Sequence, residues 1–132
     1  PDLASDRDHL AEKLAVADFG VTQFFFDADV YFRMLDDLSA RGCTTPVLPG
    51  VMPLSNPAGI ARMTQLAGAS FPTELAARVE AAAEADRERI VVEAAAELGQ
   101  RLLDGGAPGL HLYCLNRSPV AVAVSEALGL RP

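Results

Sequence analysis

The sequence predicts an α/β fold in which parallel strands form one sheet and helices cover them. Apolar, strand-like runs alternate with amphipathic helical segments, giving one helix and then three strand–helix repeats in 132 residues. The first predicted strand, residues 20–26, is apolar on both faces, which is typical of parallel sheets covered by helices. Helix-starting residues follow each strand closely. We therefore expect right-handed crossovers between neighbouring strands.

The first two helices flank the strand at residues 20–26. One helix is predicted over residues 6–17, with Ser5 as its N-cap and leucines at helical spacing. After the strand, Asp27 caps a second helix, which Arg41-Gly42 ends.

The second strand is predicted over residues 47–52. Because proline is rare in a central strand, we expect this strand to bend or end at Pro49-Gly50. Asn56-Pro57 then combines a cap with proline at the first helical position, which predicts a helix to about residue 66. Further helices are predicted over residues 72–79 and 85–103.

The last repeat begins with a strand at residues 110–115. Ser118-Pro119 repeats the device of a cap followed by proline, and the final helix is expected to end at Gly129.

Three strands are few for a closed α/β architecture. A (β/α)₈ barrel typically needs about 250 residues, so this chain would supply about half of one. A small three-stranded α/β sandwich is the alternative, but its outer strands would be apolar open edges that favour aggregation. We therefore expect part of a barrel, with residues 1–132 as a single segment.

Composition excludes several classes of function. A net charge of −7 and a sequence pI near 4.7 argue against nucleic acid, which selects basic surfaces. No apolar run is long enough for a membrane helix. Cys43 and Cys114 have no metal-binding or redox spacing, which favours a reduced, cytoplasmic setting without a metal site. Nucleotide-binding glycine motifs and the common hydrolase motifs are absent.

Polar residues stand at or just after the predicted ends of all three strands. They are Gln23 with Asp27, the turn at residues 49–53, and the segment 115–117. Because barrels carry their active sites at this end, we expect these groups to converge on a single rim. Gln23 is either a core glutamine or a site residue. A buried amide without a hydrogen-bond partner costs about 1–3 kcal/mol, so a core glutamine would need partners inside the protein.

The last strand carries three further candidates. Arg117 is placed to hold a carboxylate or phosphate with two hydrogen bonds, although a surface arginine is the alternative interpretation. His111 is expected to be a packed core residue, and Tyr113 fits either role.

Three segments together resemble the methylenetetrahydrofolate reductase family: TQFFFD at 22–27, PGVMPLSN at 49–56 and HLYCLNR at 111–117. Their order and spacing match, and the resemblance extends over essentially the whole chain. It implies a (β/α)₈ flavoprotein of which this chain holds strands six to eight. It also implies an oxidoreductase that passes a hydride from NADH or NADPH through FAD to 5,10-methylenetetrahydrofolate. The product, 5-methyltetrahydrofolate, serves methionine biosynthesis.

The resemblance assigns roles to individual residues. Gln23 resembles a glutamine that contacts the pterin or nicotinamide, Arg117 an arginine that holds the folate tail, and Leu115 packs beside the same ligand. Tyr113 lies in the same segment as a candidate substrate contact. Met63 takes the position of an aromatic residue that stacks on folate or nicotinamide, and methionine can still pack against a ring.

A second set of residues resembles flavin contacts. Asp6 and Lys13 fall where the family contacts FAD, and His9 stands where the family tends to have asparagine. Glu12 stands where a basic residue would help to bind a phosphate, and Gly59 occupies the place of a folate-contacting glutamine. These departures leave open a variant that binds FAD weakly or not at all. A solvated helix face is the alternative interpretation of this set.

By this resemblance, the family's general acid precedes the segment, so no catalytic residue is expected within it. The chain alone is then expected to be inactive. An alternative function is a non-catalytic half-barrel that dimerises, or pairs with a separate N-terminal half, through exposed Phe24 and Phe26. Another flavin-linked barrel dehydrogenase is a third possibility.

Overall fold

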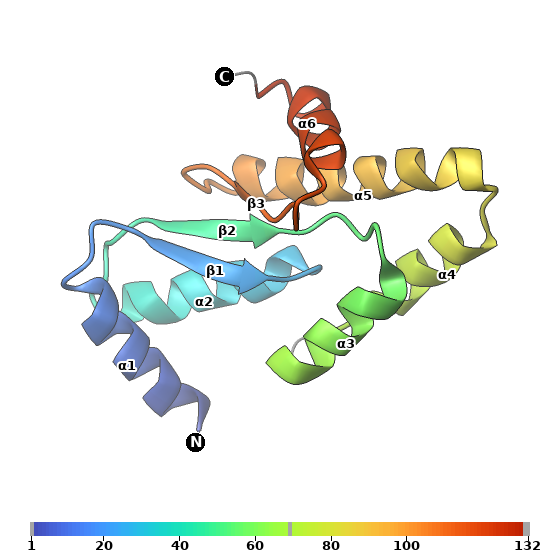
Figure 1. Cartoon of the computed structure of the whole chain (residues 1–132). Helices are drawn as coiled ribbons and strands as arrows, with labels where there is room; N and C mark the ends of the chain where they lie inside the picture. Colours follow the sequence, from blue (N-terminus) through green and yellow to red (C-terminus); the bar gives the residue numbers. More distant parts are fainter. Residues whose placement is uncertain (1, 69, 131–132) are drawn as a thin grey trace.

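A parallel three-stranded sheet, in the order β1-β2-β3, lies at the centre of the chain (Figure 1). A computed structural model of the chain describes residues 2–68 and 70–130. The elements, in chain order, are α1 (Leu3–Leu14), β1 (Gly20–Phe24), α2 (Ala28–Ala40), β2 (Val47–Val51), α3 (Pro57–Ala67), α4 (Thr73–Ala81), α5 (Glu84–Asp104), β3 (His111–Leu112) and α6 (Ser118–Ala127). This arrangement confirms the α/β prediction and is consistent with part of a (β/α)₈ barrel.

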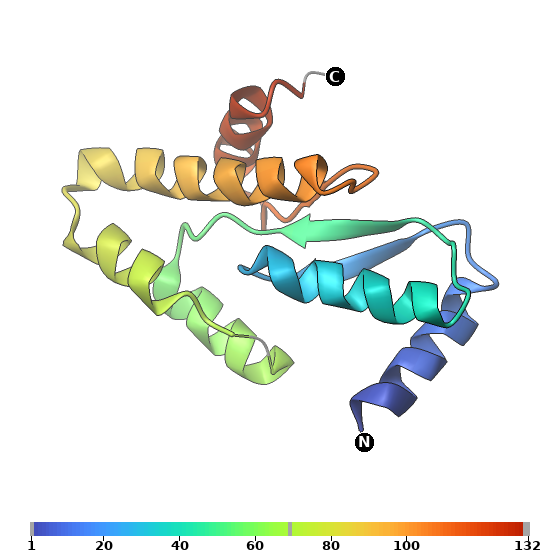
Figure 2. The same cartoon turned by 180° about the vertical axis from the view of Figure 1, so that it is seen from behind.

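Helices cover one face of the sheet. Seen from behind, α2 lies in front of β1, and α5 runs alongside β2 (Figure 2). In the opposite view no helix of the described residues crosses the strands (Figure 1). Leu112 packs into the core and neighbouring His111 is exposed, as strand alternation requires. The uncovered face corresponds to the interior of a barrel.

The main core lies between the sheet and helices α2, α5 and α6. Its fully buried members include Tyr31, Val51, Leu102 and Val124. A second, smaller cluster gathers beyond the ends of β1 and β2, where Phe24 packs with Met52, Leu54 and Ile60. The apolar sides of α2, α5 and α6 thus meet one sheet face, which is how amphipathic helices gain most of their stability.

Strand β1 contains a bulge that the sequence did not reveal. Val21 pairs with Leu48, but Phe24 pairs with Gly50, so two residues of β1 lie opposite Pro49 alone. Because proline has no N–H to donate to the neighbouring strand, regular pairing between β1 and β2 is interrupted at Pro49, and the bulge lies opposite it. The second strand does not end at Pro49-Gly50, because β2 continues to Val51, and the irregularity beside Pro49 falls on β1.

Two strands are shorter than predicted. β1 ends at Phe24 rather than at residue 26, and β3 covers only His111–Leu112 rather than residues 110–115. The chain leaves β3 through a turn in which Leu115 and Asn116 have φ values of 44° and 65°. The Arg117 N–H donates to the carbonyl of Cys114 at 2.7 Å, which closes that turn. Alternating apolar residues cannot show where such a turn begins.

The predicted helix starts are correct at two of four caps. Asp27 accepts from the N–H of Asp29, and Asn56 accepts from the N–H of Gly59. Ser5 is not a cap, because α1 begins at Leu3 and Asp2 accepts from the Ser5 N–H. Ser118 is the first helical residue of α6, and Arg117 occupies the N-cap position without a side-chain cap bond.

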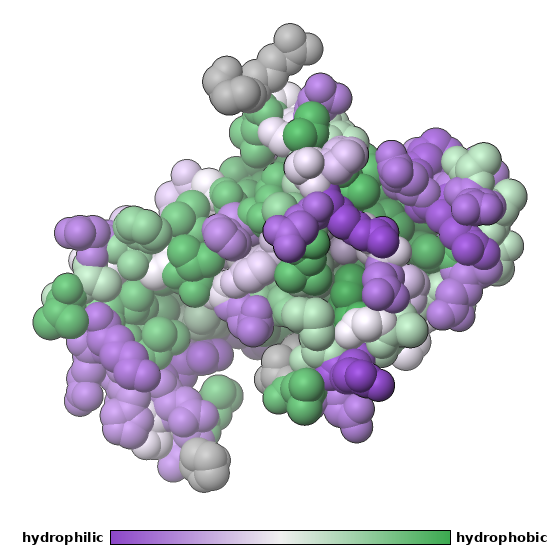
Figure 3. Space-filling view, in the orientation of Figure 1, coloured by the Kyte–Doolittle hydropathy of each residue, from purple (hydrophilic) through white to green (hydrophobic). Residues whose placement is uncertain are grey.

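Exposed apolar residues are not those expected. Phe24 is only 2% exposed and Phe26 is half-buried, so these rings are covered within the chain itself. Val16, Phe19 and Val21 are instead 90%, 57% and 43% exposed. Figure 3 shows hydrophobic surface interspersed with polar groups on the face that carries the strands.

Tyr31 offers a test of the main core. Its hydroxyl donates to the carbonyl of Val47 at 2.8 Å, and burial raises the pKa of this phenol above its ordinary value. Tyr31→Phe should lower the free energy of unfolding at pH 7 by about 1–3 kcal/mol, because a buried carbonyl loses its partner. Urea denaturation measures this change.

The same residue gives a pH dependence. Above about pH 10 the unfolded phenol loses its proton while the native one keeps it, so native stability falls. We expect the stability difference between the wild-type protein and Tyr31→Phe to be constant below pH 9 and to shrink above about pH 10. A difference that grows at high pH would contradict this assignment.

Candidate functional site

A cavity of about 230 Å³ lies where β2 and β3 end and α3 and α6 begin. Four of the predicted substrate contacts line it: Met63, Tyr113, Leu115 and Arg117. Met52 and Ile60 from the second core cluster contribute an apolar wall. The cavity therefore combines an apolar interior with one guanidinium, which suits a flat apolar ligand carrying an anionic group.

Helix α3 supplies one side of the cavity. Asn56 caps this helix and lies against Gly59, where a Cβ atom would meet the Asn56 Nδ2 at 2.6 Å. Met63 follows Gly59 by four residues, so both lie on the same face of α3. Gly59 has no side chain to offer a ligand. Of these two residues, only Met63 can therefore pack against the ring of a ligand in the cavity.

The turn between β3 and α6 supplies the other side. Leu115, in the left-handed region that leucine rarely adopts, is 57% exposed at the cavity. In the part of the chain that the structure describes, the Arg117 guanidinium makes no hydrogen bond or ion pair. It stands at the N-terminus of α6, where the helix dipole adds to its attraction for an anion.

Gln23 does not line this cavity. It is exposed on the bulge of β1, and its Oε1 accepts from the N–H of Phe24 at 3.1 Å. The interpretation of Gln23 as a core glutamine is therefore wrong. The residue before it, Thr22, is connected to the cavity because its carbonyl accepts from the Tyr113 hydroxyl at 2.9 Å.

His111 and Tyr113 form an aromatic pair beside the cavity. Their ring centroids are 4.6 Å apart at 77°, and the Tyr113 ring also contacts Phe24 edge-on at 5.9 Å. His111 is exposed, so the expectation of a packed core histidine is wrong. β3 is at one edge of the sheet, and Leu112, the neighbour of His111, packs into the core, so His111 lies on the face that no helix of the described residues crosses (Figure 1).

The predicted flavin contacts lie elsewhere. Asp6, His9 and Lys13 are exposed on α1 and share one open hollow on that helix with Glu12. Both cartoon views place α1 and α3 at opposite ends of the sheet (Figures 1 and 2). The structure thus keeps the two predicted sets of contacts apart.

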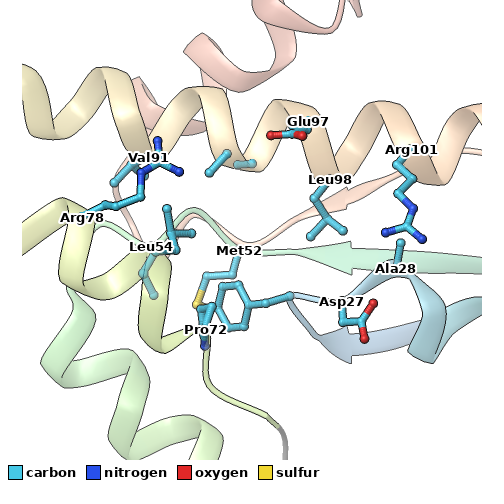
Figure 4. A pocket seen from close by; sticks show the side chains of 14 residues that line it. Asp27, Ala28, Met52, Leu54, Pro72, Arg78, Val91, Glu97, Leu98 and Arg101 are labelled. Atoms are coloured by element: carbon cyan, nitrogen blue, oxygen red, sulfur yellow. The ribbon is translucent and has the colours of Figure 1, made fainter.

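A second cavity, of about 340 Å³, lies between the start of α2, α4 and α5. Figure 4 shows Arg78 and Arg101 at its two ends, with Met52 and Leu54 between them. Arg101 is paired with Asp29 at 2.5 Å, and Asp27 is used as the cap of α2. Of the residues predicted for the site, Asp27 and Met52 line this cavity.

Two classes of site find no support in residues 2–68 and 70–130. No group of three or more histidine, cysteine or acidic side chains is arranged to hold a metal ion there. No helix in that part of the chain combines the length and apolar character needed to cross a membrane.

Comparison with known proteins decides the family. The family model described as methylenetetrahydrofolate reductase matches residues 1–129. The chain belongs to the methylenetetrahydrofolate reductase family. This confirms the resemblance carried by the three strand-end segments.

Individual methylenetetrahydrofolate reductases match over nearly the whole chain. "Methylenetetrahydrofolate reductase (NADH) 1" of Arabidopsis thaliana is 35% identical over 129 residues, which cover 96% of this chain and 22% of the relative. "Probable methylenetetrahydrofolate reductase (NADPH)" of Caenorhabditis elegans is 32% identical, covering 98% and 20%. "5,10-methylenetetrahydrofolate reductase" of Escherichia coli is 29% identical, covering 89% and 40%. The chain thus spans between a fifth and two fifths of these relatives.

Sequence reasoning missed two features of the site in this reductase family member. It did not single out Thr22, whose side chain accepts from Gly50 in β2 and whose carbonyl accepts from the Tyr113 hydroxyl beyond β3. It also missed Ile60, which forms an apolar wall of the cavity with Met52, a residue of the predicted turn at 49–53. Pro49, lacking an N–H within a buried strand, was the one signal that could have indicated the bulge.

Proposed function

We propose that this chain forms the folate-binding wall of an NAD(P)H-dependent methylenetetrahydrofolate reductase. The reaction would be reduction of 5,10-methylenetetrahydrofolate to 5-methyltetrahydrofolate. The observation that carries the proposal is the cavity in which Met63, Tyr113, Leu115 and Arg117 meet at the ends of parallel strands. Barrel enzymes place their substrates at this end.

Each side chain has a task that follows from its chemistry. Met63 and Leu115 supply apolar contacts to the aromatic part of folate. Arg117 holds a carboxylate of the folate tail through charge-assisted hydrogen bonds. Gln23, exposed at the neighbouring strand, offers an amide donor and acceptor to the pterin or to the nicotinamide.

The residues on α1 suit FAD. Lys13 offers an ammonium for the pyrophosphate, Asp6 a carboxylate for a ribose hydroxyl, and His9 a ring N–H. Glu12 on the same hollow opposes a phosphate, so we expect the affinity for FAD to be modest. When bound, FAD would carry the hydride between nicotinamide and folate.

Reduction also requires a proton donor. The cavity lining holds no carboxyl group among the described residues, so we assign the donor to a part of the barrel outside this wall. The two cysteines of the chain, Cys43 and Cys114, are free, which fits a reduced, cytoplasmic setting.

The proposal is tested by following NADH and NADPH oxidation by the complete reductase barrel that contains this chain, with FAD present. We expect oxidation that depends on 5,10-methylenetetrahydrofolate and yields 5-methyltetrahydrofolate. Absence of folate-dependent turnover with both nicotinamides, together with no folate binding by calorimetry, would contradict it.

A second candidate function is a non-catalytic module that binds ligand and assembles with another half-barrel or with itself. The exposed Val16, Phe19 and Val21 beside an uncovered sheet face favour it. Folate binding without turnover, combined with a dimer or larger complex in light scattering, is the result expected of such a module.

A further inference from the structure

Two hydroxyl groups hold the bulge of β1. The Thr22 Oγ1 accepts from the Gly50 N–H at 2.9 Å and donates to the carbonyl of Gln23 at 2.8 Å. The Tyr113 hydroxyl, reaching from beyond β3, donates to the Thr22 carbonyl at 2.9 Å. Side chains thus replace the backbone pairing that the bulge interrupts between β1 and β2.

The neighbouring residues leave space for this arrangement. Pro49 has no N–H to pair with the bulged residues, so the next donor along β2 is Gly50. A Cβ atom on Gly50 would lie 2.7 Å from the Tyr113 Cε2 and 2.8 Å from the Thr22 carbonyl oxygen. Only glycine at this position lets the tyrosine ring pass over β2 and reach β1.

The Tyr113 ring is itself held on two sides. It packs edge-on against Phe24, which is 2% exposed, and against His111. Its hydroxyl is therefore directed at the bulge by contacts independent of any ligand. Gln23 lies at the centre of the bulge, and bulges commonly redirect a side chain toward a site.

We propose that Thr22 and Tyr113 are positioning residues, whose hydroxyls clamp the β1 bulge and set the direction in which Gln23 leaves the strand. The proposal rests on the proposed function, in which Gln23 contacts the pterin or nicotinamide. Tyr113 also lines the folate cavity, so the same ring connects the folate wall to the orientation of Gln23.

The clamp itself is tested without any substrate. Amide hydrogen exchange of Gly50 is measured in the full chain for the wild-type protein, Thr22→Val and Thr22→Ser. Thr22→Val removes the acceptor and is expected to speed exchange about tenfold, whereas Thr22→Ser keeps the hydroxyl and should recover most of the protection. Thr44→Val, at an exposed threonine, is the matched control. Equal exchange in Thr22→Val and the wild-type protein would overturn the clamp.

The positioning role is tested by kinetics of the complete reductase barrel that contains this chain, in two backgrounds. Tyr113→Phe, which keeps the ring, is expected to lower kcat/KM roughly tenfold in the wild-type protein, mostly through kcat. In a Gln23→Ala background the same substitution should have little further effect, because the two residues act through one group. Equal losses in both backgrounds would overturn the role assigned to Gln23.

Failure of the proposed function is distinguishable from failure of this inference. A wild-type protein that neither binds folate nor turns over would overturn the positioning role, since no reaction then needs Gln23. The amide hydrogen exchange of Gly50 in the wild-type protein and in Thr22→Val needs no folate, so it would still support or overturn the clamp.

Discussion

Replacing Arg117 by alanine is expected to weaken the binding of 5-methyltetrahydrofolate by roughly 10- to 100-fold. The guanidinium lines the cavity and has no hydrogen-bond or ion-pair partner among the described residues, so a ligand carboxylate would be its main partner. A hydrogen bond to a charged group contributes about 1.5–3 kcal/mol, which corresponds to this range of affinity. Isothermal titration calorimetry measures the change.

Two further variants make the Arg117 result specific. Arg117→Lys keeps the charge but loses the planar pair of donors, so it should recover only part of the affinity. Arg62→Ala removes an exposed arginine of α3 that does not line the cavity, and its affinity should equal that of the wild-type protein. If Arg117→Ala binds within twofold of wild type, the folate-binding wall is wrongly assigned.

Gly50→Ala is expected to destabilise the protein by about 3 kcal/mol, the upper end of the range for overpacking a closed site. The new methyl group would meet a backbone oxygen as well as the Tyr113 ring, and the backbone cannot move aside within a paired strand. The free energy of unfolding in urea measures the loss. Affinity for folate should fall as well, because Tyr113 must leave its place in the cavity wall.

Gly42→Ala is the matched control for this effect. Nothing lies within 4 Å of a Cβ atom at Gly42, whose φ is +73°, so only the backbone conformation opposes alanine there. We expect a loss of about 1 kcal/mol and unchanged folate affinity. Equal destabilisation by the two substitutions would contradict the close approach at Gly50.

Helix starts were predicted correctly where a capping residue stands directly before an amphipathic run. Asp27 and Asn56 were recognised as caps because each stands directly before an amphipathic run. At the start of the chain Ser5 was predicted as the cap, but α1 already begins at Leu3. The structure uses Asp2, three residues before the N–H of Ser5 that it accepts from.

Features that depend on neighbouring strands could not be predicted from one segment. Gln23 was placed on a two-sided buried strand, but its exposure follows from a sheet face without a covering layer among the described residues. The bulge beside it is caused by Pro49 on another strand. The end of β3 depends on a turn with left-handed Leu115, a conformation that its sequence does not favour.

The site was predicted from motifs rather than from geometry. The segment 111–117 and Met63 meet at one cavity, although residues 64–110 separate them in the sequence. Proximity of this kind follows from parallel strands whose ends share one edge. Thr22 remained unrecognised because its importance lies in bonds to Gly50 and to Tyr113.

A crystal structure of the protein with bound 5-methyltetrahydrofolate tests the central claim most directly. We predict that the tail carboxylate contacts the Arg117 guanidinium, that the aromatic part packs between Met63 and Leu115, and that the Gln23 amide faces the ligand or the adjoining nicotinamide position. Folate bound instead in the cavity between α2, α4 and α5, with Arg117 free of ligand, would contradict the account.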